Sequence, residues 1–131
     1  MMRPGITLDT GALIALEAGR LAMRKVFYAA LQHDARITVP AVVVAEWWRA
    51  GRREKERAKL LRSVHVEALE KHVAMAAGKA LGLVSDSTTI DALVLASAAL
   101  RGDTIYTSDV SDLERLRAGV PGFAHVQIAQ A

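Results

Sequence analysis

Residues 6–19, ITLDTGALIALEAG, have the pattern of a short strand followed at once by a helix. Ile6, Thr7 and Leu8 are β-branched or aliphatic, which is typical of a buried strand, and Asp9 follows directly. From Thr10 to Gly19 the apolar residues recur at helical spacing and a glycine closes the segment. The sequence therefore predicts a strand, an acidic residue at its carboxyl end, and then a helix.

The same alternation continues along the chain. Further strands are expected over residues 36–39, 65–68, 104–107 and 125–128, and helices over 21–33, 40–51, 70–83, 88–100 and 110–118. The basic segment up to residue 62 is expected to form a further helix, which continues the helix that contains Glu46. Strands separated by helices favour a mostly parallel sheet covered on both faces, a three-layer α/β/α fold. Right-handed crossovers place all strand carboxyl ends at one edge, where open α/β sheets bind ligands.

Composition limits the classes of protein that fit. The chain has 131 residues, so one domain over residues 1–131 is expected, and 52% hydrophobic residues exclude a disordered chain. Without cysteine there is no disulfide, thiolate zinc site or catalytic thiol, and the four histidines form no short-spaced pair for zinc. No apolar run reaches the roughly 20 residues of a membrane span, and no secretory signal is evident. A cytoplasmic location without membrane contact is expected.

Positive charge is concentrated in one segment. The formal net charge is +3, yet residues 49–62 alone contain seven basic and two acidic side chains. Outside this segment the chain is slightly acidic. The segment is either a solvated helix face or a contact surface for a polyanion or an acidic partner.

Four carboxylates stand where a sheet edge would collect them. Asp9 and Asp109 follow predicted strands, whereas Glu46 and Asp91 lie within apolar helices. Each has an ordinary explanation. Asp9 and Asp109 are candidate helix N-caps, Asp91 fits a capping box with Thr88, and Glu46 is a candidate solvent-facing residue.

The combination favours a metal site over four separate explanations. Glu46 shares a helix face with Val42 and Val43, and Asp91 shares one with Val94, so both are expected on packed faces. Burying a carboxylate costs several kcal/mol unless it is compensated. Like charges gathered at one edge also raise one another's pKa. A divalent cation removes this repulsion, and oxygen ligands suit Mg²⁺ or Mn²⁺.

Four segments carry a resemblance to a known family. LDTGALIAL (residues 8–16), VVVAEWWR (42–49), TIDALVLASA (89–98) and YTSD (106–109) resemble the four signature blocks of PIN-domain ribonucleases. Their order, their spacing and the chain length most resemble VapC, the toxin of bacterial VapBC toxin–antitoxin pairs. The similarity extends from Ile6 to the last predicted strand. It implies a PIN-like fold and a Mg²⁺-dependent endoribonuclease, with Mn²⁺ able to substitute.

The resemblance also implies roles for individual residues. The acidic quartet is Asp9, Glu46, Asp91 and Asp109, with Asp9 and Asp91 the firmest metal ligands. Accessory candidates are Thr10, Thr107, Ser108 and Asp112, of which Asp112 is alternatively a helix cap. Gly11 replaces a serine that is frequent in the family, and this change is not expected to impair metal binding. Basic residues that would grip RNA phosphates without reading sequence are Arg49, Arg52, Arg53 and Lys55.

Partners follow from the same resemblance, and other classes of protein fit less well. A homodimer, an RNA substrate and a VapB-like antitoxin whose tail covers the acidic cleft are expected. Trp47 and Trp48 point about 100° apart on a helix, so at most one belongs to the core and the other is a packing or partner contact. Gly11 stands where a haloacid-dehalogenase-type enzyme needs a second acid, and a receiver domain would need an acidic pair and a late lysine. A catalytically silent PIN-like module that binds RNA or protein remains the alternative, although it would have no reason to keep four repelling carboxylates.

Overall fold

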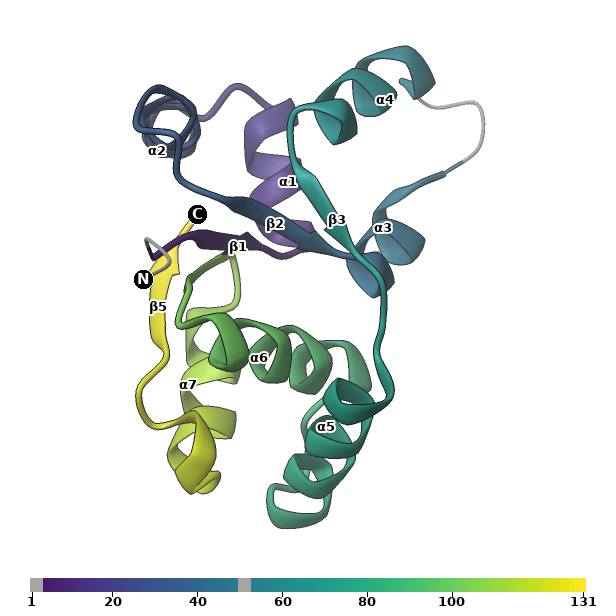
Figure 1. Ribbon diagram of the computed structural model, residues 1–131, viewed down its shortest axis with the longest axis vertical. Coiled ribbons are helices and arrows are strands. Elements are labelled where there is room, and N and C mark those ends of the chain that lie inside the picture. Colours follow the sequence, from purple (N-terminus) through teal and green to yellow (C-terminus); the bar gives the residue numbers. More distant parts are fainter. Residues whose placement is uncertain (1–3, 50–52) are drawn as a thin grey trace.

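The computed structural model describes residues 4–49 and 53–131, which form a five-stranded sheet between two layers of helices (Figure 1). The strands are β1 (Ile6–Leu8), β2 (Ile37–Pro40), β3 (His65–Glu67), β4 (Thr104–Thr107) and β5 (Gln127–Gln130). Their order is β3-β2-β1-β4-β5, and every neighbouring pair is parallel. The predicted α/β class is confirmed, with a sheet that is wholly rather than mostly parallel.

Helices cover both faces of the sheet. They are α1 (Thr10–Glu17), α2 (Leu21–Gln32), α3 (Ala41–Trp47), α4 (Glu54–Arg62), α5 (Lys71–Leu83), α6 (Thr89–Arg101) and α7 (Val110–Gly119), followed by the short 3₁₀ helix η1 (Pro121–Phe123). Figure 1 shows α1, α2 and α4 on one side of the sheet and α5, α6 and α7 on the other. Helix α3 lies beyond the carboxyl end of β2 and contacts both α1 and α6.

The basic segment forms a helix, α4, as predicted, but the prediction that it continues the Glu46 helix is wrong. Helix α3 ends at Trp47 because the backbone of Trp48 is extended, and Arg53 stands in the left-handed region with φ 46° before α4 begins. The guanidinium of Arg57 donates to the carbonyl of Trp47 and so satisfies an acceptor at the end of α3. Of the two tryptophans, Trp47 is buried and Trp48 is half-buried, as the helical spacing predicted.

The last predicted strand is displaced by two residues. It was expected over residues 125–128, whereas β5 begins at Gln127. His125 lies in the turn before the strand, where its ring nitrogen Nε2 is 2.9 Å from the carbonyl oxygen of Ala99. The pairing of β5 with β4 sets the register, and this is a long-range contact that local sequence does not contain.

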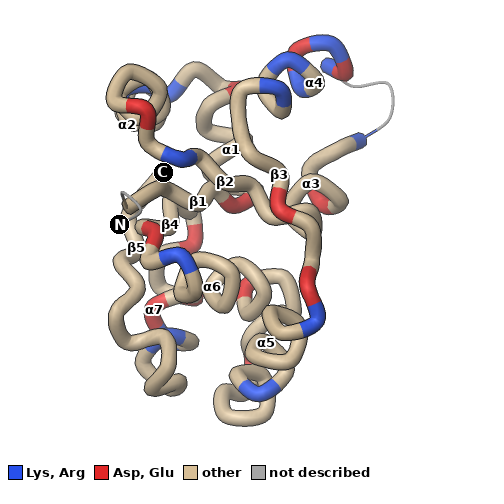
Figure 2. Tube along the Cα trace, viewed as in Figure 1, with Lys and Arg blue, Asp and Glu red and all other residues tan. Residues whose placement is uncertain are grey.

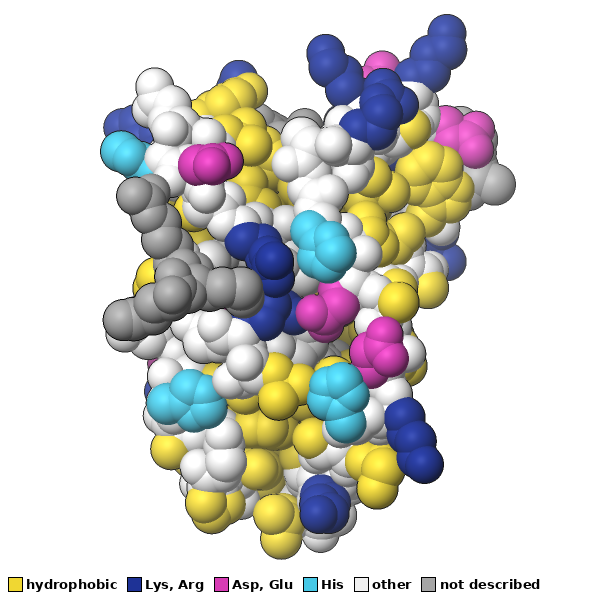
Figure 3. Space-filling model, viewed as in Figure 1, with side chains coloured by type: hydrophobic (Ala, Val, Ile, Leu, Met, Phe, Trp, Pro, Cys, Tyr) yellow, Lys and Arg dark blue, Asp and Glu magenta, His cyan; other side chains and the backbone are white. Residues whose placement is uncertain are grey.

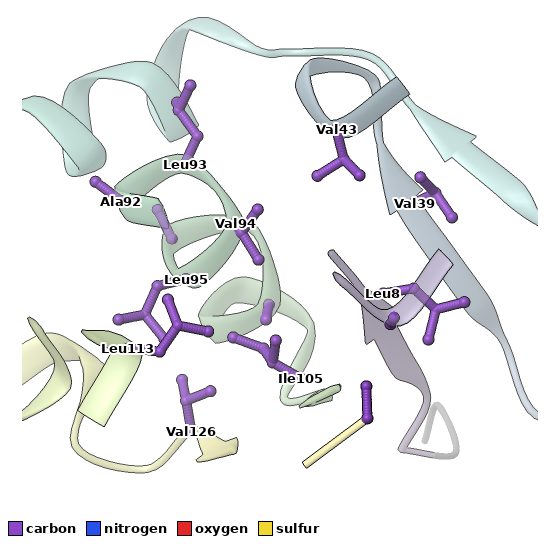
Figure 4. Packing of buried hydrophobic residues seen from close by; sticks show 14 of the residues in the cluster. Leu8, Val39, Val43, Ala92, Leu93, Val94, Leu95, Ile105, Leu113 and Val126 are labelled. Carbon is purple, nitrogen blue, oxygen red and sulfur yellow. The ribbon is translucent and has the colours of Figure 1, made fainter. Parts of the chain in front are cut away.

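Helix α6 is the centre of the core. Its residues from Ala92 to Ala98 are all buried, since the sheet covers one side and α5 and α7 cover the rest. Figure 4 shows Leu95 of α6 beside Leu113 of α7, with Ile105 of β4 close by. Shortening such a fully buried leucine to alanine costs about 2–5 kcal/mol. This packing fixes the position of Asp91 in the first turn of α6.

A buried ion-pair network holds the other end of α6. The Arg101 guanidinium pairs with Asp103, with Nε and Oδ2 2.9 Å apart, and also with Glu67 of β3. Thr7 of β1 accepts from Arg101 and donates to Asp103 Oδ2, 2.9 Å away. The network therefore ties α6 to strands β1 and β3 and to the start of β4.

None of the helices in the described part of the chain is both long and apolar enough to span a bilayer.

Candidate metal centre

The sheet reverses its strand order between β1 and β4. From β1 the chain proceeds outward to β2 and β3, whereas from β4 it proceeds the other way to β5. Helices α1 and α7, which follow these two strands, lie on opposite faces of the sheet (Figure 1). The segments that leave β1 and β4 therefore diverge and open a crevice at the carboxyl ends, the usual binding position in such sheets. Asp9 and Asp109 each stand in this crevice.

The crevice is a cleft of about 350 Å³. Its lining residues are Asp9, Thr10, Gly11, Ile14, Glu46, Thr88, Ile90, Asp91, Ser108, Asp109 and Asp112. The structure thus brings together all four residues of the predicted acidic quartet, together with three of the four accessory candidates. No lysine, arginine or histidine is among the described residues that line it. The cleft, which we call the acidic cleft, concentrates negative charge without a cation of its own.

Asp9 caps α1 and faces the acidic cleft at the same time. Its Oδ1 accepts from the backbone N–H of Ala12 at 3.0 Å, so the N-cap interpretation is correct without excluding a role in the cleft. Burial raises the pKa of Asp9, and the charges of Asp91 and Asp109 raise it further. Hydrogen bonds from Thr107 and Ala12 oppose this shift without cancelling it.

Thr107 explains why Asp9 and Asp109 face each other. Its side chain is fully buried, bonds to the Asp9 carboxylate, and accepts from the backbone N–H of Asp109 at 2.9 Å. Although it does not line the cleft itself, it lies behind these two acids. Asp109 occupies the N-cap position of α7 but makes no capping bond with its side chain.

Asp91 is held by the start of α6. The Thr88 hydroxyl accepts from the backbone N–H of Asp91 at 3.1 Å, so Thr88 caps the helix. Burial raises the pKa of Asp91, and the nearby charges of Asp112, Asp109 and Glu46 add to the effect. These mutual effects show that the carboxylates of the cleft lie close enough to repel one another.

The position of Glu46 differs from the prediction. It was predicted on a packed helix face, but its side chain is exposed at the mouth of the cleft. Val43 and Trp47 form the buried face of α3, and Glu46 lies about 100° from Trp47 around the helix. The Thr10 hydroxyl donates to Glu46 Oε1 and directs this carboxylate toward the others.

Asp112 differs from the quartet because it already has a cationic partner. Arg115, one turn along α7, lies 3.3 Å from Asp112 Oδ1 and also reaches the carbonyl of Asp86. Asp112 stands inside the first turn of α7, so it is not the residue that caps this helix.

Gly11 is required by the space around it. A Cβ atom at this position would lie 2.1 Å from Ser108 Oγ and 2.9 Å from the Ser108 backbone nitrogen. From sequence, Gly11 was only a small departure from a family pattern. Sequence reasoning also missed Ile14 and Ile90 as lining residues, since isolated apolar residues at helical spacing usually indicate core.

The donor set of the cleft fits Mg²⁺ or Mn²⁺. The half-buried acids Glu17 and Glu67 and the buried Asp103 each pair with an arginine. By contrast, none of the quartet carboxylates forms an ion pair within residues 4–49 and 53–131. Oxygen-only ligands of this kind suit hard divalent cations. Among the described residues, no three acidic or histidine side chains surround one point, and Glu46 and Asp109 lie exposed at the rim of the cleft.

The basic residues lie beside the cleft rather than in it. Arg49, Arg53 and Lys55 are exposed, and Arg52 lies outside the described residues. Figures 2 and 3 show the lysines and arginines of α4 gathered at one end of the molecule. Their role toward RNA stays a prediction.

Comparison with known proteins identifies the family. The PIN domain profile matches residues 6–118, so the chain belongs to the PIN domain family. A comparison with curated protein sequences gives no match.

Among solved structures, the chain is similar in fold to toxin–antitoxin complexes. The VapBC complex of Salmonella typhimurium bound to DNA gives a TM-score of 0.76 at 16% identity, with 98% of each chain covered. VapBC2 of Rickettsia felis bound to a promoter DNA fragment gives 0.72 at 16% identity, covering 96% of this chain and 98% of that one. A toxin–antitoxin complex of Klebsiella pneumoniae gives 0.69 at 17% identity, covering 95% and 96%. The predicted PIN-like fold and the resemblance to VapC are confirmed.

Proposed function

We propose that this PIN domain protein is a Mg²⁺-dependent endoribonuclease and the toxin of a toxin–antitoxin pair. One observation carries the proposal. Asp9, Glu46, Asp91 and Asp109 meet in one cleft at the switch point of the sheet, and the described residues provide them with no cationic partner. Such a cluster is electrostatically unfavourable unless a cation binds there.

The proposed ligands divide into an inner pair and a pair at the rim of the cleft. Asp9 and Asp91 are fixed by bonds at the start of their helices, and Glu46 and Asp109 complete the set from the exposed rim. Bound there, Mg²⁺ or Mn²⁺ supplies a Lewis acid and a water of lowered pKa for attack on a phosphodiester. Thr10 and Thr107 orient the carboxylates. With no histidine or lysine among the described lining residues, Glu46 and Asp109 are the side chains able to orient the attacking water.

RNA cleavage by the purified protein tests this function. Total RNA is incubated with the protein and Mg²⁺, and new 5′ ends are mapped. Asp9→Asn and Asp91→Asn variants should lose cleavage while keeping the fold, since asparagine is as good an N-cap as aspartate at position 9. Undiminished cleavage by both variants, or none by the wild-type protein with either Mg²⁺ or Mn²⁺, would refute the proposal.

A cognate VapB-like antitoxin is the proposed partner, supported by the fold of the VapBC complexes. A second hollow of about 240 Å³ between α1, α2 and α4 offers a docking groove, lined by Leu16, Phe27, Tyr28 and Leu60 among others. A neighbouring reading frame for a small DNA-binding protein supplies the candidate. Its co-expression should inhibit cleavage and weaken Mg²⁺ binding, and a protein that binds without either effect would contradict this assignment.

We further propose a cytoplasmic homodimer in which residues 1–131 act as one domain. Sedimentation of the purified chain without antitoxin checks the stoichiometry. A monomer at micromolar concentration would contradict it.

A further inference from the structure

One exposed face of α1 connects the acidic cleft to α4. Thr10, Ile14 and Ala18 follow one another at helical spacing, so they share this face. Thr10 and Ile14 line the acidic cleft, and a further hollow of about 280 Å³ is lined by Ile14, Glu17, Ala18, Arg53 and Arg57. Ile14 lines both hollows and therefore lies between them. From Thr10 to Ala18 the helix rises about 12 Å.

The two arginines at the far end have different surroundings. Arg57 is occupied, since its Nε lies 2.7 Å from Glu17 Oε2 and its guanidinium stacks 4.7 Å from the centre of the Trp47 ring. Arg53 is exposed, and its guanidinium forms no ion pair within 4 Å of a carboxylate of the described residues, although its charge helps to lower the pKa of Glu17. Arg57 thus anchors α4 to the rest of the fold, whereas the guanidinium of Arg53 is exposed and can contact a ligand.

Ile14 lies between the two charged ends of this face. Its side chain is 53% exposed although it stands in the middle of a helix whose other face belongs to the core. Ile14 thus offers an apolar surface between the acidic cleft and the exposed guanidinium of Arg53. In a single strand of RNA, apolar bases and charged phosphates follow one another in the same way. Single strands are also the form in which proteins recognise RNA sequence most readily.

We propose that this face of α1 is a track for single-stranded RNA, with a base against Ile14 and a phosphate bound by Arg53, a few nucleotides from the cut. The proposal rests on the proposed nuclease function. Charge favours RNA over a peptide here, because the acidic cleft repels a phosphate chain and a cation just outside it offsets that repulsion. A peptide that brought a basic side chain to the cleft would gain nothing from Arg53.

Binding of labelled single-stranded RNA tests the track. Asp9→Asn serves as the background so that the RNA stays intact, and affinity is measured at several salt concentrations with Mg²⁺ present. Arg53→Gln should weaken binding and reduce the slope of log K against log salt by about 0.7, the value of one lost phosphate contact. Arg62→Gln, which removes the same charge about 13 Å away at the other end of α4, should change neither quantity.

A second pair of variants separates the apolar contact from the charge. Ile14→Ala should weaken binding several-fold with the salt slope unchanged, whereas Leu100→Ala, at an exposed leucine on α6, should leave both unchanged. If Arg53→Gln and Arg62→Gln weakened RNA binding equally, or if Ile14→Ala and Leu100→Ala did, the track would be overturned. The loss of affinity would then come from net charge or from exposed apolar surface in general.

Two further results keep the conclusions distinct. If the wild-type protein cuts RNA but Arg53→Gln binds it as Arg62→Gln does, the track is wrong and the nuclease function stands. If the wild-type protein cuts no RNA, the nuclease function fails first. Unchanged RNA affinity of Arg53→Gln with weaker antitoxin binding would assign this face to a protein partner and overturn the track.

Discussion

Gly11 packs so closely on Ser108 that a Cβ atom at position 11 would lie 2.1 Å from the serine Oγ. The start of α1 is therefore pressed against the segment that joins β4 to α7. This close approach brings Asp9 and Asp109 into one cleft, and it depends on the absence of a side chain.

The first prediction concerns Gly11→Ala. The added methyl group also meets the backbone nitrogen of Ser108, so the two segments must separate, and the cost should be about 1–3 kcal/mol of unfolding free energy. Mg²⁺ affinity should fall as well, because Asp9 and Asp109 move apart. Gly78→Ala is the control, since a Cβ at Gly78 in α5 meets nothing and should be neutral or stabilising. Equal stability of the two variants, measured by thermal unfolding, would contradict the packing argument.

The second prediction concerns pH in the absence of metal. Burial, and then the neighbouring acids, raise the pKa of Asp9 and Asp91 above the value of 3.8 in the unfolded chain. A raised pKa means that the folded state prefers the protonated acid, so stability is greatest at low pH and falls as pH rises through and above this value. Asp9→Asn should therefore melt a few degrees higher than the wild-type protein at neutral pH in EDTA. Asp34→Asn, at an exposed left-handed position that asparagine tolerates, should not.

Unfolding curves in EDTA between pH 4 and pH 8 check this prediction. The difference between Asp9→Asn and the wild-type protein should narrow toward pH 4. A difference that grew on acidification would show that the carboxylate stabilises the fold, the opposite of what its surroundings imply.

The third prediction concerns the ion itself. Mg²⁺ should raise the melting temperature of the wild-type protein at neutral pH, and EDTA should reverse the rise. At a concentration of 100 times Kd the gain is about 2.7 kcal/mol. The gain should be lost in Asp91→Asn, whose cleft retains less charge to attract the ion. No response to Mg²⁺ or Mn²⁺ in the wild-type protein would instead favour a catalytically silent PIN module.

The fourth prediction concerns Asp112, which lines the acidic cleft but is not one of the four proposed metal ligands. Asp112 has a cationic partner that the quartet residues do not have among the described residues, with 3.3 Å between the Arg115 guanidinium and Oδ1. Asp112→Asn should therefore keep most of the cleavage rate and Mg²⁺ affinity that Asp91→Asn loses. Loss of both to the same degree would make Asp112 a ligand.

Local sequence was sufficient for the features that depend on single strands and helices. Strand β1 followed by Asp9, and strand β4 followed two residues later by Asp109, predicted that both acids share one sheet edge, because parallel strands align their carboxyl ends. Thr10, which the resemblance to PIN-domain ribonucleases suggested as an accessory residue, also lines the cleft. These predictions were possible because each one depends only on which residue follows a strand or begins a helix.

Features that depend on long-range contacts could not be predicted in this way. The end of α3 is stabilised by Arg57, which contacts the Trp47 carbonyl from ten residues further along the chain. The helical pattern of the sequence does not show this contact, and it therefore predicted that the two helices are continuous. The exposure of Glu46 follows from which side of this short helix meets the body. In each case the deciding partner lies in another element.

The fifth prediction concerns the contact that joins α4 to the rest of the fold. Arg57 and Glu17 pair with only 12% and 13% of their side chains exposed, and Trp47 Nε1 donates to Glu17 Oε1 at 2.9 Å. Arg57→Gln leaves the Glu17 charge half-buried and unpaired, which should cost about 3–5 kcal/mol of unfolding free energy. Arg62→Gln, on the same helix but in no ion pair with another described residue, should cost much less.

Two measurements identify why Arg57→Gln loses stability: the pH dependence of unfolding, and the stability of the double variant Glu17→Gln/Arg57→Gln. Although burial acts to raise the pKa of Glu17, the bonds from Arg57 and Trp47 outweigh it and lower the pKa below 4.5. The pair therefore stabilises the fold above that pH, and its contribution is lost on acidification. Adding Glu17→Gln to Arg57→Gln should recover part of the lost stability at neutral pH, because no unpaired charge remains. If the double variant is less stable than Arg57→Gln alone, the loss comes from packing of the arginine on Trp47 rather than from its charge.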